Sequence, residues 1–189
     1  GNIDPALIEE RITPRTKAIL VVDVFGHPAE MDRINQIAEK YGLKVIEDSC
    51  EAIGAEYNGE RVGRKCDAAV FAFFPNKQIT TGEGGVIVTA NEKLAKLCSS
   101  MRNQGRNEDL EWLSHERLGY NYWMDGMSAA MGTAQLERIQ EILDKRQKVA
   151  EMYEQRLKDV GGITLQHISP NIKMSWFVFV VRVKEEIRD

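Results

Sequence analysis

Asp48 and Lys77 are the two residues whose types and positions fit chemistry on a carbonyl compound. Asp48 ends an apolar segment, residues 43–48 (LKVIED), and Lys77 follows residues 67–73 and a turn that contains Pro75. A lysine amine in an otherwise apolar pocket stays partly deprotonated, so it is able to attack a carbonyl carbon. A carboxylate beside the nitrogen of a pyridine ring makes that ring an electron sink. The pair therefore indicates a ligand with both a carbonyl group and a pyridine ring.

Each of these features has a plainer interpretation when it is taken alone. An acid at the end of a strand often caps a turn, and a single lysine after a strand usually lies on the surface. The glycines of residues 80–85 (TTGEGG) let the backbone approach a ligand or itself closely, and they more often form a turn. All three features lie at strand ends, where open α/β sheets bind ligands, and together they favour a site.

The elements that position these residues follow from the spacing of apolar side chains. Residues 17–24 (KAILVVDV) and 43–48 are nearly continuous apolar runs, which predicts strands covered on both faces of a sheet. A helix that stops at Gly42 is predicted between them from residues at steps of three and four, namely Met31, Ile34, Ala38 and Tyr41. This order favours a right-handed parallel crossover. Residues 67–73 and 85–90 predict further strands, so the fold class is an open α/β sheet.

The second half of the sequence predicts a loop, a long helix and two more strands. Residues 102–122 are polar and rich in Asn, Gly and charge, which is typical of a long functional loop. One helix is expected from about Ser128 to Leu157, because apolar residues recur at helical spacing over this stretch. Strands are predicted at residues 163–166 and 176–183 (WFVFVVRV).

The composition is that of an ordinary folded domain and argues against several classes of function. With 43% hydrophobic and 29% charged residues, the chain is able to bury a core. A net charge of −4, with no basic cluster denser than residues 61–65, argues against a nucleic-acid partner. The longest apolar run, residues 68–74, is too short to cross a membrane, and no signal peptide is predicted. Three cysteines without C-x-x-C spacing fit reduced thiols in a cytoplasmic protein and no metal site.

Four segments of the sequence share the motifs of one family. They are residues 45–63 (VIEDSCEAIGAEYNGERVG), 71–89 (FAFFPNKQITTGEGGVIVT), 101–105 (MRNQG) and 119–139 (GYNYWMDGMSAAMGTAQLERI). On these motifs, essentially the whole chain resembles the DegT/DnrJ/EryC1/StrS family of pyridoxal-phosphate-dependent sugar aminotransferases. The resemblance implies a fold-type I transferase, with an open, mostly parallel sheet, helices on both faces and the start of a small C-terminal domain.

The resemblance also implies a domain division and a longer protein. It assigns residues 1–140 to the large cofactor-binding domain, without its N-terminal portion, and residues 141–189 to a connecting helix and a truncated small domain. We therefore expect this stretch alone to lack a complete site, to be inactive and not to retain the cofactor.

Position by position, the resemblance gives three residues a role at the cofactor. Lys77 would form the internal Schiff base with the cofactor aldehyde, and Asp48 would keep the pyridine nitrogen protonated. Glu51 stands where the family more often has Gln near the phenolic oxygen of the cofactor. A carboxylate there repels a phenolate unless the two share a proton.

Three further positions concern the phosphate group of the cofactor. Ala72 replaces a Ser that donates to the phosphate in many members, and Trp123 stands where Arg is common. Asn121 matches an Asn that reaches the phosphate across a dimer interface. The resemblance thus implies a homodimer with shared active sites.

The implied reaction moves an amino group from L-glutamate to the 4-keto group of a nucleotide-linked 4-keto-6-deoxyhexose. Two alternatives stay open: a non-catalytic regulatory or scaffold relative of the same fold, and a sugar dehydratase that uses the same cofactor. The dehydratases have His in place of the lysine, so Lys77 argues against that alternative. A nucleotide-dependent dehydrogenase is disfavoured because no G-x-G-x-x-G follows a strand.

Overall fold

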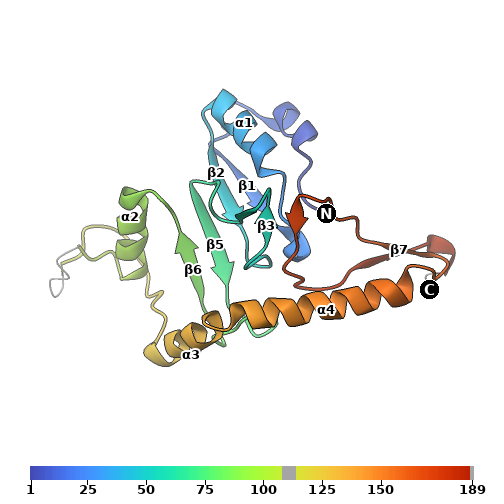
Figure 1. The fold of residues 1–189 in the computed structure, drawn as a ribbon. Coiled ribbons are helices and arrows are strands. Elements are labelled where there is room, and N and C mark those ends of the chain that lie inside the picture. The colour runs from blue at the N-terminus through green and yellow to red at the C-terminus, as the bar shows by residue number, and fades with distance from the viewer. Residues whose placement is uncertain (108–113, 188–189) are drawn as a thin grey trace.

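The computed structural model describes residues 1–107 and 114–187 (Figure 1). The helices are α1 (Met31–Tyr41), α2 (Glu92–Arg102), α3 (Gly126–Leu136) and α4 (Ile139–Leu157). The strands are β1 (Ala18–Val22), β2 (Lys44–Asp48), β3 (Glu56–Tyr57), β4 (Glu60–Arg61), β5 (Ala68–Ala72), β6 (Gly85–Val88), β7 (Ile163–Leu165), β8 (Ile172–Lys173) and β9 (Val181–Val183). Short 3-10 helices lie at Pro5–Leu7, Glu9–Arg11, Val24–Gly26 and Glu185–Ile187.

The main sheet has the strand order β1-β2-β5-β6. Strands β1, β2 and β5 run parallel, and β6 returns antiparallel to β5. The carboxyl ends of β1, β2 and β5 therefore meet at one edge of the sheet, above α3 and α4 in Figure 1. This arrangement confirms the predicted α/β class with a mostly parallel sheet.

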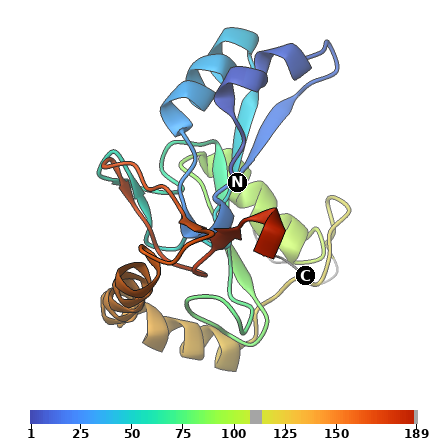
Figure 2. The same ribbon diagram turned by 90° about the vertical axis from the view of Figure 1, so that its right-hand side faces the viewer.

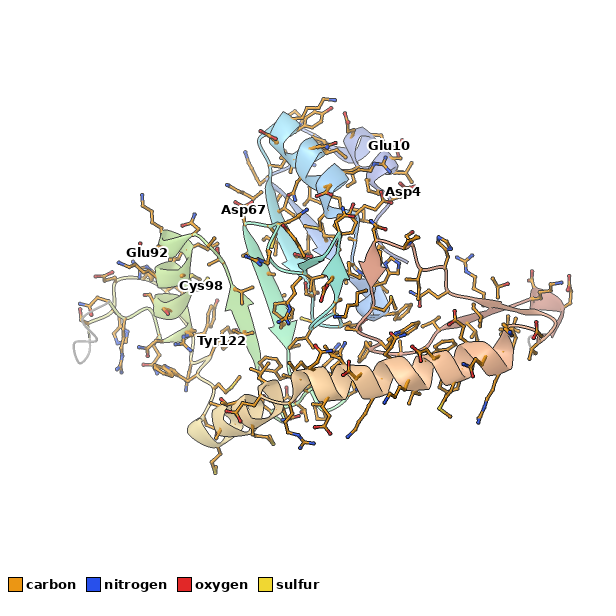
Figure 3. All side chains as sticks on the ribbon, viewed as in Figure 1. Asp4, Glu10, Asp67, Glu92, Cys98 and Tyr122 are labelled. Carbon is orange, nitrogen blue, oxygen red and sulfur yellow. The ribbon has the colours of Figure 1, made fainter. Side chains whose placement is uncertain are left out.

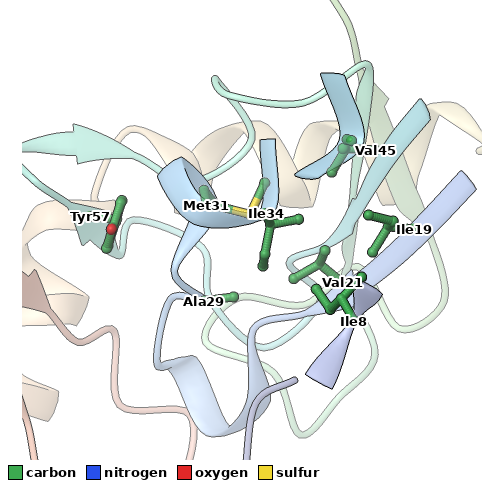
Figure 4. Close-up of a cluster of buried hydrophobic side chains, with 9 residues drawn as sticks. Ile8, Ile19, Val21, Ala29, Met31, Ile34, Val45 and Tyr57 are labelled. Carbon is green, nitrogen blue, oxygen red and sulfur yellow. The ribbon is translucent and has the colours of Figure 1, made fainter. Parts of the chain in front are cut away.

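The hydrophobic core lies between one face of this sheet and α1 (Figure 4). Helix α1 forms where predicted: it stops at Gly42, which adopts the left-handed φ of 61° that favours glycine. Its buried side chains pack against alternate residues of β1 and β2, namely Ile19, Val21 and Val45. Each such side chain contributes about 2 kcal/mol by leaving water.

The opposite face of the sheet, here named the open face, carries apolar side chains that the described residues leave partly exposed. Strand register puts alternate residues on this face, because side chains alternate along a strand. Leu20 is 61% exposed whereas its neighbour Val21 is fully buried. The members of the open face used below are Leu20, Val22, Ile46, Asp48, Val70 and Ile87.

The prediction of one long helix from Ser128 to Leu157 is wrong in one respect, because the structure has two helices there. Helix α3 ends at Leu136, and α4 starts at Ile139 after Arg138 adopts φ −108° and ψ 13°, outside the helical range. The amide of Gln135 bonds both backbone groups of Thr80, which anchors the end of α3 to the loop before β6. Apolar spacing continues across the break, so periodicity alone predicts a single helix.

The prediction of a strand at residues 176–183 is also wrong for most of its length. Only Val181–Val183 forms a strand, paired with β7. Trp176 has a φ of 51°, which a strand does not accommodate. The carbonyl oxygens of Trp176 and Phe177 accept hydrogen bonds from Arg146 of α4 instead of from a neighbouring strand.

The C-terminal region is connected to the first part of the chain by a small sheet. Strand β8 pairs antiparallel with β3, which also pairs with β4. Figure 2 shows the segments after α4, in dark orange and red, above that helix. The N–H of Ser175 donates to the carbonyl of Gly26, shortly after β1, so this region packs close to the carboxyl ends of the main-sheet strands.

Candidate active site

Asp48 is the last residue of β2 and the charged member of the open face. Strand register places it between Val22 of β1 and Val70 of β5. One carboxylate oxygen, Oδ1, accepts a hydrogen bond of 3.1 Å from the backbone N–H of Cys50. The carboxylate thus lies among apolar side chains at the edge where three parallel strands end.

Lys77 follows β5 in a turn closed by a 3.0 Å hydrogen bond from its N–H to the carbonyl of Phe74. Figure 3 labels Asp67 at the amino end of β5, so Lys77 lies beyond the other end of that strand. Its side chain is only 15% exposed. The amine Nζ lies 3.4 Å from Oε1 of Glu51 and 4.3 Å from the ring centroid of Phe177. An aromatic ring face attracts a cation, so Phe177 both covers the end of the Lys77 side chain and helps to hold it in place.

Glu51 is held by three contacts besides Lys77. Its Oε2 accepts a 2.8 Å hydrogen bond from the N–H of Phe25, a residue with a left-handed φ of 62°. Its carbonyl oxygen accepts from Nε2 of Gln78 at 2.5 Å and from Oγ of Ser175 at 3.2 Å. The position of the Glu51 carboxylate beside Lys77 is therefore fixed from several elements.

Cys50 lies between two of the predicted site residues in the chain. Its N–H donates to Asp48, and it precedes Glu51, whose carboxylate contacts Lys77. Burial, followed by the Asp48 carboxylate, raises the pKa of the Cys50 thiol to about 12, while the Lys77 ammonium lowers it and Glu51 raises it. Cys50 is a protonated, neutral neighbour of the site at physiological pH.

Asn121 lies elsewhere in the described residues. It forms an isolated bridge with Asn103 at the end of α2, it is exposed, and no described contact joins it to Lys77, Asp48 or Glu51. Figure 3 shows the adjacent Tyr122 near β6, below Cys98 of α2. Residues 108–113 of the predicted loop lie outside the described residues.

Two of the three departures from the family motif, Ala72 and Trp123, occupy ordinary structural positions. Ala72 ends β5 opposite Gly85. The ring of Trp123 lies 4.9 Å from the guanidinium of Arg102, and its Nε1 donates to Asn103 at 2.8 Å. These two contacts hold the loop that contains Trp123 against the end of α2. The glycine-rich residues 80–85 form the turn into β6, and a side chain at Gly85 would lie 2.8 Å from the carbonyl oxygen of Phe71.

Two residues near the site were not identified from the sequence. Phe177 lies in the segment predicted as a strand, and Arg146 lies in the middle of the predicted long helix. Arg146 donates to the carbonyl of Lys77 at 3.4 Å. Neither has a local signal, because a single aromatic in an apolar run and a single Arg on an amphipathic helix are common in any fold.

Asp23 and Glu47 form a buried acidic pair on the face of the sheet opposite Asp48. Asp23 is fully buried and accepts from the Ala29 N–H at 2.9 Å and the Ser49 hydroxyl at 2.8 Å. Burial, followed by the charge of Glu47, raises the pKa of Asp23 to about 7. Glu47 accepts from the Gly63 N–H at 2.8 Å, and its Oε1 has no described partner. A proton shared within this pair relieves the repulsion between the two carboxylates.

Neither a metal centre nor a membrane-spanning helix is found in residues 1–107 and 114–187. No three His, Cys, Asp or Glu side chains of this part gather as metal ligands would. None of its helices has the length and apolar character to cross a bilayer.

Comparisons with known proteins identify relatives of this chain. GDP-perosamine synthase of Caulobacter vibrioides is 42% identical over 185 residues, which are 97% of this chain and 50% of that protein. The erythromycin biosynthesis sensory transduction protein EryC1 of Saccharopolyspora erythraea is 40% identical over 182 residues, which are 96% of this chain and 49% of that protein. The chain spans about half the length of the curated relatives it matches.

A solved structure gives the same result for the fold. The crystal structure of S. venezuelae DesV in complex with a ketimine intermediate is 36% identical and superposes with a TM-score of 0.92. It covers 97% of this chain and 49% of the DesV chain, which confirms the predicted fold class. Residues 1–189 all match one family in the comparison with protein families. The chain therefore belongs to the DegT/DnrJ/EryC1/StrS aminotransferase family.

Proposed function

We propose that the protein is a pyridoxal-phosphate-dependent sugar aminotransferase whose reacting amine is Lys77. The observation that carries this proposal is the 3.4 Å contact between Nζ of Lys77, after β5, and Oε1 of Glu51, which follows Asp48 at the carboxyl end of β2. The family uses this cofactor, which agrees with the chemistry that an amine and a carboxylate at two strand ends would serve.

The residues present fit the cofactor. The open face offers an apolar surface for a planar ring, with Val22 and Val70 on either side of Asp48. The Asp48 carboxylate has no described ion pair, and one hydrogen bond from Cys50 leaves it able to accept a proton-bearing ring nitrogen. The Lys77 amine comes from the next strand along the sheet. Lys77, Asp48 and Glu51 would hold the cofactor from this chain.

The side chains then have separable tasks. When bound, the cofactor supplies an aldehyde and a ring that withdraws electrons from the reacting carbon. Asp48 holds a proton at the ring nitrogen, and Nζ of Lys77 moves a proton to and from the substrate carbon. Glu51 accepts a hydrogen bond from Nζ, and Phe177 keeps water from one side of the amine.

The substrates we propose are L-glutamate as the amino donor and a nucleotide-linked 4-keto-6-deoxyhexose as the acceptor. Relatives at about 40% identity include several named GDP-perosamine synthase, so a perosamine-synthase-like reaction is the specific form of this proposal. A relative at 36% identity is named as a transaminase of a dTDP-linked sugar.

A non-catalytic regulator is the alternative with a specific observation in its favour. Two relatives at 40% identity are named a sensory transduction protein and a pleiotropic regulatory protein. A PLP-dependent sugar dehydratase is less favoured, because Lys77 is present where those relatives have His. The regulator and the enzyme differ in one testable respect, which is whether Lys77 reacts with the cofactor.

The test is a visible spectrum of the product of the complete gene after addition and removal of excess cofactor. We expect a stable absorption band that L-glutamate bleaches, because Lys77 would hold the aldehyde of the cofactor, and transfer of the glutamate amino group would convert that aldehyde to an amine with release of the keto acid. Lys77→Arg is the matched control, since it retains a cation beside Glu51 but has no nucleophilic amine at neutral pH. A wild-type protein without the band, or a band that persists in Lys77→Arg, contradicts the proposal.

We further propose that the protein is a homodimer in which Asn121 acts in the site of the partner subunit. No described contact joins Asn121 to Lys77, and exposed apolar side chains lie near Asn121 in the chain: Tyr122 in the same loop is 70% exposed and Met127 in the first turn of α3 is 84% exposed. An apolar surface of this kind is typical of an interaction site.

Mixing Lys77→Ala and Asn121→Ala subunits of the complete protein is expected to restore activity. One site of each mixed dimer carries both changes and the other carries neither, so random exchange gives about a quarter of wild-type activity. Native mass spectrometry verifies that subunits have exchanged. Mixed dimers without activity contradict the shared site.

The domain division and the location of the protein are proposals of the same kind. We propose a boundary near residue 140, where α4 begins, between the cofactor-binding domain and the connecting helix with the small domain. The cysteines Cys50, Cys66 and Cys98 are free thiols in the structure, which supports a cytoplasmic location.

A further inference from the structure

Arg146 makes hydrogen bonds to three main-chain carbonyls next to the candidate active site. Its Nη1 donates to the carbonyl oxygens of Trp176 at 2.9 Å and Phe177 at 3.2 Å, and its Nη2 donates to that of Lys77 at 3.4 Å. No described carboxylate forms an ion pair with it, and burial lowers the pKa of its guanidinium. A partly buried cation without an acidic partner costs free energy. The three hydrogen bonds of Arg146 must offset this cost, so the segments that they connect are of interest.

The carbonyls belong to two segments that meet at the lysine. One is the turn that carries Lys77, and the other is residues 175–177, here named the cover segment. Gln78 donates to the Ser175 hydroxyl at 2.8 Å, and the N–H of Ser175 donates to the carbonyl of Gly26 at 3.2 Å. The cover segment places the Phe177 ring 4.3 Å from Nζ of Lys77.

We propose that Arg146 is a positioning residue that sets the orientation and solvent access of the Lys77 amine. It does so by tying the lysine turn to the cover segment, which keeps the Phe177 ring over Nζ. The inference rests on the proposed function only in taking Lys77 as the reacting amine. Arg146 itself does not touch Nζ in the structure; its described contact with Lys77 is to the main chain.

An arginine is required for this task. The two terminal nitrogens of a planar guanidinium reach separate acceptors at fixed angles, whereas a lysine has one compact ammonium group. The backbone of the cover segment also needs support, because Trp176 holds a left-handed φ of 51°. Such a conformation persists in a non-glycine residue only where its surroundings enforce it.

The experiment is brief amine labelling with trinitrobenzenesulfonate, with the product of the complete gene freed of cofactor. Mass spectrometry of peptides gives the ratio of labelled Lys77 to labelled Lys17, an exposed lysine distant in sequence. In Arg146→Met we expect this ratio to rise by roughly fivefold or more, because release of the cover segment exposes an amine that was shielded. Arg146→Lys should also raise the ratio. Arg156→Met, an exposed change on the same helix, should leave it unchanged.

Phe177 provides the second arm of the test. Phe177→Leu should raise the ratio without any change at Arg146, and Phe177→Tyr should keep the wild-type value because the ring is retained. If Arg146→Met does not fold, the labelling ratios of Arg146→Lys and of the two Phe177 variants still test the proposal. A lower melting temperature with an unchanged labelling ratio would show that Arg146 is merely structural and would overturn the inference. Labelling needs no cofactor, so a missing absorption band contradicts the proposed function and leaves this result standing.

Discussion

Asp48→Asn is expected to slow amino-group transfer by about a thousandfold or more, which corresponds to about 4 kcal/mol of transition-state stabilisation. In the proposed site the Asp48 carboxylate would hold a proton at the pyridine nitrogen, and a protonated ring would withdraw electrons from the reacting carbon. A neutral amide does not hold that proton. The loss should fall on the rate of the half-reaction with L-glutamate, measured by stopped-flow absorption on the complete protein.

The structure separates this expectation from a purely structural role of Asp48. The contact that the fold itself uses is the hydrogen bond from the Cys50 N–H to Oδ1, and the amide oxygen of Asn accepts it equally well. A capping role therefore predicts a rate within a few-fold of wild type. Such a rate would show that the assignment of the electron sink to Asp48 is mistaken. Cofactor binding by Lys77 should survive the change, which provides an internal control.

Asp23→Asn is expected to change the pH dependence of stability by a few kcal/mol. The pKa of Asp23 is raised to about 7 in the folded protein, from an ordinary value of 3.8. Between these values the folded state binds the proton and the unfolded state does not. The free energy of unfolding therefore falls as the pH rises from about 4 to about 7, on the order of a few kcal/mol in total. Asn does not titrate, so the variant loses this slope.

The measurement is chemical denaturation of both proteins at pH 4.5 and pH 8. From pH 4.5 to pH 8 wild type loses stability and Asp23→Asn does not, so the variant should gain stability relative to wild type. The variant should still fold, because its amide retains the bond from the Ala29 N–H and is able to donate to Glu47. Asp67→Asn is the matched control without a slope in this window. The Lys44 ammonium and the Val45 N–H lower the pKa of Asp67 below 3.8, so its contribution is present at both pH 4.5 and pH 8, and this variant should keep the pH dependence of wild type. Equal slopes in wild type and Asp23→Asn would refute the shared proton.

The sequence predicts those elements whose local signals agree with their packing. Helix α1 has buried residues at helical spacing and Gly42 at its end, and β1 and β2 form in the predicted apolar runs. The prediction that both faces of these strands are covered is wrong for the described residues, because only alternate side chains of β1 and β2 are buried. Prediction fails where one tertiary contact outweighs the pattern. Trp176 lies in an apolar run that favours a strand, but Arg146 takes the carbonyl groups that a strand would use. The break at Arg138 likewise has no signal in the apolar spacing.

The candidate site shows the same division. Asp48 and Lys77 are predicted because each stands at the end of an apolar strand, and the structure places Asp48 at the end of β2 and Lys77 in contact with Glu51, three residues after Asp48. Their catalytic roles stay predictions. Phe177 is exactly a hundred residues after Lys77, and only folding makes them neighbours. Residues that act through space on a distant part of the chain leave no periodic or spacing signal, which is why Arg146 and Phe177 required a structure.

Adjacent acids on opposite faces of β2 make the strand intolerant of insertions and deletions. Glu47 belongs to the buried pair with Asp23, and Asp48 belongs to the open face. A shift of one residue exchanges the faces of every side chain in a strand. Deletion of one residue of β2 before Glu47 would place Glu47 on the open face and Asp48 on the buried face, with very little change in composition. Sequence variation in this strand should therefore proceed by substitution, with its length held constant.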